Sequence, residues 1–122
     1  MAPSQDDTEW SDMTPDGVPS VPATAVPEDG VLLDVREDDE WTAGHAPQAV
    51  HVPMGDVPQR IGEIPGGGTV HVVCRSGGRP AQVTAYLNQG GWQAVNVDGG
   101  MHAWAAAGRP MVAGSGRPPQ VV

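Results

Sequence analysis

The sequence predicts an α/β fold, a small doubly wound parallel sheet flanked by helices. Two observations lead to this prediction. Short apolar runs with few polar residues alternate with segments of helical pattern, which is typical of parallel strands buried on both faces. Glycine and proline clusters separate many of these segments and indicate turns. The apolar runs lie at 31–35, 49–52, 70–74 and 94–97.

Two strands with a helix between them are predicted to form the first part of the sheet. Residues 31–35 are apolar except for Asp34 and form the first expected strand. Residues 37–42 begin with acidic side chains, which are favourable at the amino end of a helix, and Gly44 follows as a terminator. Residues 49–52 form a short second strand.

The middle of the chain is predicted to form a helix, a turn and the most strand-like run. Residues 56–64 are expected to be helical, with Asp56 as the N-cap and Pro58 in the first turn. One proline and three glycines at 65–68 indicate a turn. Residues 70–74 then form a strand.

The last part repeats the pattern of helix, strand and helix. Residues 80–88 are predicted to be a helix that starts at Pro80 and ends before two glycines. Residues 94–97 form the next strand. Residues 100–107 form the final helix, which Gly108 ends.

Composition divides the chain into three parts. Residues 1–20 are rich in Asp, Pro and Ser and cannot bury enough apolar surface to offset their ordering entropy. We expect them to form a flexible leader, and we expect residues 113–122 to form a flexible tail for the same reason. The folded domain is then 21–112, which is near the small end of the range for a single core.

Charge and composition exclude several classes of function. The 122 residues include 15 acidic side chains and six basic ones, all arginine, for a net charge of −9. The arginines form no basic stripe, which argues against nucleic-acid binding because phosphate contacts dominate such binding. The acidic amino-terminal segment is neither a secretory signal nor a membrane span. We therefore expect a cytoplasmic protein with no membrane or nucleic-acid partner.

The only cysteine, Cys74, ends the most strand-like run. Ligands of parallel sheets bind beyond the carboxyl ends of the strands, where Cys74 is expected to lie. Two glycines and two arginines follow before the helix predicted at Pro80. Backbone N–H groups of such a loop and the amino end of a helix attract anions, so this loop can stabilise a thiolate. The pattern predicts that Cys74 is a nucleophile.

Other interpretations of Cys74 remain open at this point. A lone cysteine is most often a small buried hydrophobic residue. A cysteine-based redox sensor is a further alternative. One cysteine, without a closely spaced histidine pair, gives too few soft ligands for a zinc site, so no metal is expected.

Three motifs in order resemble those of single-domain rhodaneses, a sulfurtransferase family of α/β fold. The motifs lie at 32–41 continued by 44–53, at 74–79, and at 90–104. Together they cover nearly all of the predicted domain. The six-residue loop from Cys74 to Arg79 resembles sulfurtransferases rather than phosphatase-type loops, which place an arginine where Pro80 stands. Gln48 departs from the family, which usually has glycine there, and Pro80 stands where Ser or a similar residue is frequent.

The resemblance implies a sulfurtransferase without a metal or organic cofactor. It would move a sulfane sulfur from thiosulfate or a persulfide donor, through a persulfide on Cys74, to an acceptor. The acceptor would be cyanide, a small-molecule thiol, a thioredoxin-like protein or a sulfur-carrier protein, because no second cysteine is present to accept the sulfur. The alternative is a rhodanese-like binding or regulatory module with little turnover.

Roles for individual residues follow from the same resemblance. The loop residues after Cys74 are expected to bind the substrate: Arg75, Ser76, Gly77, Gly78 and Arg79. The two arginines would hold the anionic end of the donor, since planar guanidinium groups suit oxyanions. Asp34 and Arg36 are expected to form a structural motif that orders neighbouring loops.

Overall fold

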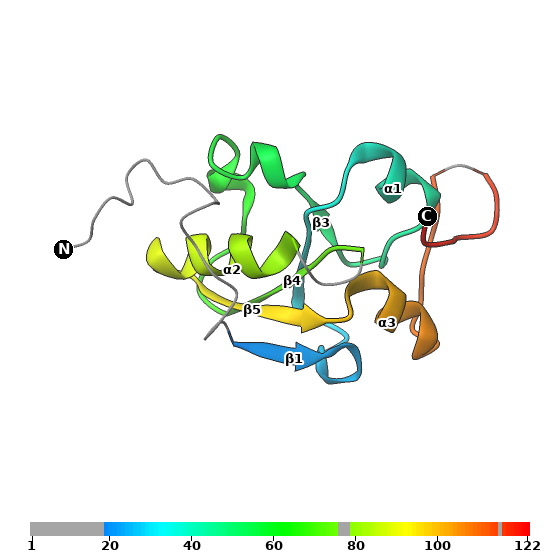
Figure 1. Cartoon of the computed structure of the whole chain (residues 1–122), viewed down its shortest axis with the longest axis horizontal. Helices are drawn as coiled ribbons and strands as arrows, with labels where there is room; N and C mark the ends of the chain where they lie inside the picture. The colour runs from blue at the N-terminus through cyan, green and yellow to red at the C-terminus, as the bar shows by residue number, and fades with distance from the viewer. Residues whose placement is uncertain (1–18, 76–78, 115) are drawn as a thin grey trace.

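A single five-stranded parallel sheet with helices on both faces confirms the predicted α/β fold (Figure 1). The structure is a computed structural model, and it describes residues 19–75, 79–114 and 116–122. The strand order is β1-β5-β4-β2-β3. The elements in chain order are β1 (Ser20–Pro22), η3 (Ala23–Ala25), β2 (Val31–Asp34), α1 (Asp38–Ala43), β3 (Val50–His51), η4 (Met54–Asp56), η5 (Ile61–Glu63), β4 (Thr69–Val73), α2 (Arg79–Gln89), β5 (Gln93–Asp98) and α3 (Gly100–Ala106).

Each face of the sheet has its own buried cluster, because alternate side chains of a strand point to opposite faces. The face under α2 is packed by aliphatic side chains that include Val70, Val72, Val83 and Leu87. The opposite face is packed against α3 by a second set that includes Leu32, Val73, Met101 and Trp104. Burial on both faces explains why the strands read as continuous apolar runs rather than as alternating ones.

The central strand β4 brings the carboxyl ends of three strands together. It pairs with β2 on one side and with β5 on the other. Asp34 and Val73, the last residues of β2 and β4, are register partners. The Val35 N–H donates to the Val73 carbonyl oxygen at 3.1 Å, so the segments leaving β2 and β4 are tied together just beyond the strands.

The helix predicted at 56–64 is wrong. The segment forms two short 3₁₀ turns, η4 and η5, which are held mainly by bonds between residues three apart, such as Val57 N–H to the Met54 carbonyl oxygen at 3.3 Å. The turn η4 already starts at Met54, so Pro58 stands beyond the first turn, where it has no N–H with which to continue an α-helical ladder, and Gly62 disfavours a helix interior. Asp56 is therefore not the N-cap of an α-helix.

Strand β1 was not predicted from the sequence. It has only three residues and ends in Pro22, and it pairs with β5 in the register Ser20 to Asn96. A proline is tolerated here because β1 is an edge strand. The rest of the predicted leader, residues 1–18, lies outside the described residues.

The carboxyl-terminal residues contact the domain. The Gly114 and Gln120 N–H groups donate to the carbonyl oxygens of Thr42 and Ala43 at 3.0 and 2.9 Å. Val121 packs against the α3-side cluster. That residues 113–122 form a flexible tail stays a prediction.

Candidate active site

Cys74 is the first residue after β4, at the carboxyl edge of the sheet. Cys74 is only 1% exposed and belongs to the buried cluster on the α2 face, which it shares with Val70 and Val72 of β4. The sulfur therefore lies below the protein surface, at the end of the most central strand.

The connection between β4 and α2 follows Cys74 directly. Arg75 is exposed, and α2 begins at Arg79, one residue before the predicted start. Pro80 therefore lies in the first turn, as predicted, where its missing N–H breaks no helical bond. The remaining predicted loop residues, Ser76 to Gly78, and the side chain of Arg79 lie outside what the structure describes. The amino end of the eleven-residue α2 brings partial positive charge to this edge of the sheet.

A second helix is bonded to the backbone of Cys74. The Met101 N–H donates to the Cys74 carbonyl oxygen at 2.7 Å, and the His102 N–H donates to the Arg75 carbonyl oxygen at 3.0 Å. Both donors lie in the first turn of α3, where N–H groups have no partner within the helix. This contact was not predicted from the sequence, because a bond between two backbones requires no particular side chain.

Asp34 and Arg36 form a buried ion pair at the end of β2. Both side chains are fully buried, and Arg36 Nη2 lies 2.8 Å from Asp34 Oδ2. The Arg36 Nε donates to both Asp34 oxygens, at 2.9 and 3.2 Å, and the Arg36 backbone N–H donates to Oδ1 at 3.0 Å. The carboxylate thus organises the turn that follows its own strand.

The same arginine also donates to one carbonyl oxygen within α1 and to one at its C-cap. Arg36 Nη1 donates to the Glu40 carbonyl oxygen at 3.2 Å, and Nη2 donates to the Gly44 carbonyl oxygen at 2.7 Å. Gly44 is the C-cap of α1, so Arg36 satisfies a carbonyl group that the helix end leaves without a partner, whereas the Glu40 oxygen also accepts from the Gly44 N–H at 3.4 Å. Because the guanidinium is bound within the protein and is not exposed, it is not available to a substrate in this conformation.

Two histidines stack on Trp41 beside this ion pair. The Trp41 ring lies 3.5 Å from the His45 ring and 4.6 Å from the His51 ring, in nearly parallel planes. His51 Nε2 lies 2.8 Å from the Arg36 carbonyl oxygen, and His45 Nδ1 lies 2.7 Å from the Trp41 carbonyl oxygen. This stack joins α1 and β3 to the segment that carries Arg36.

Gln48 does not carry the backbone strain that a glycine position would impose. No non-glycine residue has a positive φ in the described ranges, and this includes Gln48. Replacement of the usual glycine at this position is therefore compatible with ordinary backbone geometry.

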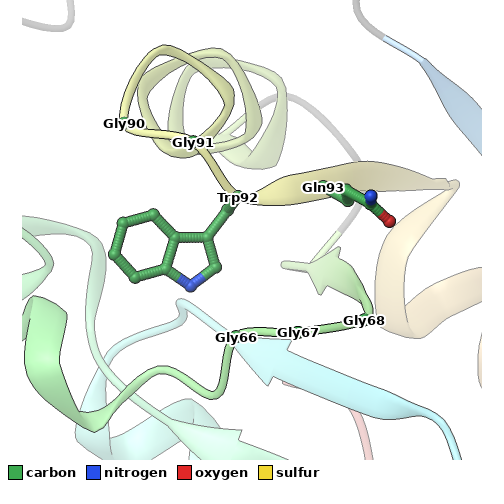
Figure 2. Close-up of a pocket in the computed structure, with 7 residues that line it drawn as sticks. All are labelled: Gly66, Gly67, Gly68, Gly90, Gly91, Trp92 and Gln93. Carbon is green, nitrogen blue, oxygen red and sulfur yellow. The ribbon is translucent and has the colours of Figure 1, made fainter.

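One surface hollow lies away from Cys74. It has a volume of about 350 Å³ and is lined by Trp92 and Gln93, by glycines 66–68 before β4 and by glycines 90–91 before β5 (Figure 2). These residues are at the amino edge of the sheet, whereas Cys74 is at the carboxyl edge. Figure 2 shows the Trp92 indole between the two glycine segments, and its Nε1 donates to the Pro65 carbonyl oxygen at 3.2 Å.

The described residues contain no group of three or more His, Cys, Asp or Glu side chains close enough to hold a metal ion. Among the same residues, none of the helices is both long and apolar enough to cross a membrane.

Comparisons with known proteins agree with the geometry. The chain is 43% identical over 90 residues to a protein of Allochromatium vinosum named "Sulfurtransferase", a match that covers 73% of this chain and 84% of that protein. Among solved structures, a rhodanese-related protein from Thermoplasma volcanium superposes with a TM-score of 0.72 at 28% identity, covering 77% of this chain and 97% of that one.

A rhodanese-like domain protein from Staphylococcus aureus superposes with a TM-score of 0.65 at 30% identity, covering 84% of this chain and 98% of that one. The profile of the Rhodanese-like domain family matches residues 23–107, from the end of β1 to the end of α3. This chain therefore belongs to the Rhodanese-like domain family.

Proposed function

We propose that the protein is a sulfurtransferase that carries a sulfane sulfur as a persulfide on Cys74. The observation that carries the proposal is the place of Cys74, directly after the central strand and between that strand and the amino end of α2. Family membership and the 43% identity to a protein named "Sulfurtransferase" support the same reaction class.

In the first step, the Cys74 thiolate attacks the outer sulfur of a donor such as thiosulfate. The new bond joins the two sulfur atoms, the sulfur–sulfur bond of thiosulfate breaks, and sulfite leaves with the electron pair of that bond. The product is an anionic persulfide on Cys74. Partial positive charge at the amino end of α2 and the loop N–H groups of residues 75–79 stabilise this anion.

In the second step, an acceptor attacks the outer persulfide sulfur and Cys74 leaves as a thiolate. Cyanide yields thiocyanate, and a thiolate acceptor yields its own persulfide. The chain has one cysteine, so the acceptor is a separate molecule. We propose a small-molecule thiol, a thioredoxin-like protein or a sulfur-carrier protein, and we expect ping-pong kinetics.

Donor binding is assigned to the loop arginines. Arg75 is exposed next to Cys74, which suits a residue that meets an anionic donor at the surface. We assign the same role to Arg79 and hydrogen bonding to Ser76, Gly77 and Gly78. Arg36 is not included, because it is buried and bound to Asp34.

The test is a mass measurement on the intact protein. After incubation with thiosulfate and removal of excess reagent, the wild type is expected to gain the mass of one sulfur atom. Later addition of cyanide should remove that atom and release thiocyanate. Cys74→Ser, which keeps a similar shape but lacks the thiol, should show neither change.

A binding or regulatory module with little turnover is the second candidate. The burial of Cys74 to 1% exposure favours it, because a donor must reach a sulfur that is covered in this conformation. No gain of mass from thiosulfate or from a persulfide donor would support this second function over the first.

A further inference from the structure

We infer that Gly100 is a positioning residue, and that the first turn of α3 clamps the Cys74–Arg75 backbone in the conformation that sulfur transfer needs. The inference rests on the proposed function for its kinetic consequence. It rests on separate contacts for its structural part, namely the two hydrogen bonds from α3 and the lack of space at Gly100.

The two hydrogen bonds form one clamp on consecutive residues. Met101 donates to the Cys74 carbonyl oxygen at 2.7 Å, and His102 donates to the Arg75 carbonyl oxygen at 3.0 Å. A peptide unit is planar, so fixing two successive carbonyl groups fixes the orientation of the Cys74–Arg75 peptide. The direction in which the chain leaves Cys74 and Arg75 therefore depends on α3.

Gly100 allows α3 to approach this peptide. A Cβ at Gly100 would overlap the Cys74 carbonyl oxygen and would lie 2.8 Å from the Arg75 carbonyl carbon. These obstacles are backbone atoms, which cannot move aside as the end of a flexible side chain can. Gly100 also has a φ of +56°, a region that other residues adopt rarely.

Neighbouring glycines do not have this relation to the cysteine. Gly99 also has a positive φ of +75°, but the nearest obstacle to a Cβ there is the Ala103 side chain of the same helix, at 2.7 Å. Gly108, after α3, has a φ of +72°, and no atom lies within 4 Å of the position that a Cβ would take there. Gly108→Ala therefore imposes the strain of positive φ without touching the cysteine, which makes it the matched control for Gly100→Ala.

The experiment compares these two alanine variants in the full chain. Thermal unfolding measures the stability that each loses, and persulfide formation from thiosulfate measures kcat/KM. Gly100→Ala is expected to lower kcat/KM by about tenfold or more, since small misplacements at a reacting centre have large effects on rate. Gly108→Ala is expected to keep the wild-type value despite a loss of stability. An equal kcat/KM in the two variants would overturn the inference.

A second variant covers the case in which Gly100→Ala does not fold. His102→Pro deletes the N–H that donates to Arg75, at an exposed first-turn position where this N–H has no partner within the helix. The proline ring also disfavours the helical conformation of Met101, the other donor of the clamp. His102→Ala removes the same imidazole but keeps the N–H, and it is the reference for the proline variant. The inference requires kcat/KM to be lower for His102→Pro than for His102→Ala, and equal values would overturn it.

Hydrogen exchange separates this inference from the proposed function. The amide of Met101 should be protected in the wild type and in Gly108→Ala, and it should exchange faster in Gly100→Ala. If the wild type forms no persulfide while this pattern holds, sulfur transfer fails as a function and the clamp stands. If exchange at Met101 is unchanged in Gly100→Ala, the clamp is overturned whatever the activity.

Discussion

Arg36 illustrates how one buried side chain supports three segments. It binds the Asp34 carboxylate at the end of β2, and it donates to the carbonyl oxygens of Glu40 and Gly44 in and after α1. A buried ion pair costs desolvation energy, which only good geometry and additional hydrogen bonds offset. Here the additional bonds are those to the carbonyl oxygens of α1 and its C-cap. Removal of the arginine should therefore abolish these bonds as well as the ion pair.

We predict that Arg36→Met destabilises the protein by about 3–5 kcal/mol, because the Asp34 carboxylate would remain buried without its cation. Urea unfolding at neutral pH measures the change. A loss well below this range would mean that water or another group replaces the guanidinium.

Arg60→Met is the matched control for an exposed ion pair. The Arg60 guanidinium lies 2.8 Å from the Glu63 carboxylate, and its hydrogen bond holds the pKa of Glu63 below the ordinary value. Both side chains are substantially exposed, so solvent screens the pair and the variant should lose much less stability than Arg36→Met.

At the level of elements, the carboxyl end of α1 is where the chain terminus packs. Gly44 has an extended backbone, φ 172°, that any residue can adopt. A Cβ at this position would nevertheless lie 2.5 Å from the Gln120 carbonyl oxygen and 2.7 Å from its nitrogen. The structure therefore links α1 to a segment that the sequence predicts to be a flexible tail.

We predict that Gly44→Ala costs about 1–3 kcal/mol, the usual range for overpacking, because the added methyl group meets backbone atoms of Gln120. Gly62→Ala is the control, since no atom lies within 4 Å of its added Cβ. Denaturant unfolding of both variants measures the difference.

The same pair of variants decides whether residues 113–122 are a flexible tail. In a chain shortened after Val112, Gly44→Ala should lose most of its destabilising effect, because the backbone of Gln120 is no longer present. If Gly44→Ala is harmless in the full chain, the segment is not held on α1 and the prediction of a flexible tail is correct.

For the whole molecule, the sheet and the place of Cys74 could be predicted, while the contacts that fix its backbone could not. Strands buried on both faces consist of continuous apolar runs, so β2, β4 and β5 are visible in the sequence. Strand β1 is too short for any such pattern. The bond from Met101 to Cys74 joins backbone groups far apart in the sequence, and only Gly100 marks it, as a residue that the sequence alone assigns to a helix start.

Net charge belongs to the whole molecule, and its effect on the cysteine can be measured without assuming a sulfur donor. The protein carries a formal charge of −9, which repels anions at long range, and salt screens this repulsion over about 10 Å at 0.1 M.

Cys74 is the only thiol, so alkylation by iodoacetate, an anion, and by neutral iodoacetamide reports on one site. We predict that added salt accelerates the reaction with iodoacetate and leaves that with iodoacetamide unchanged. The protein unfolded in urea, where charges are dispersed, should show a smaller salt effect. If salt instead slows the reaction of iodoacetate with the folded protein, the positive charge of Arg75 and of the helix ends near Cys74 outweighs the net charge. The acidic surface then does not hinder an anionic donor.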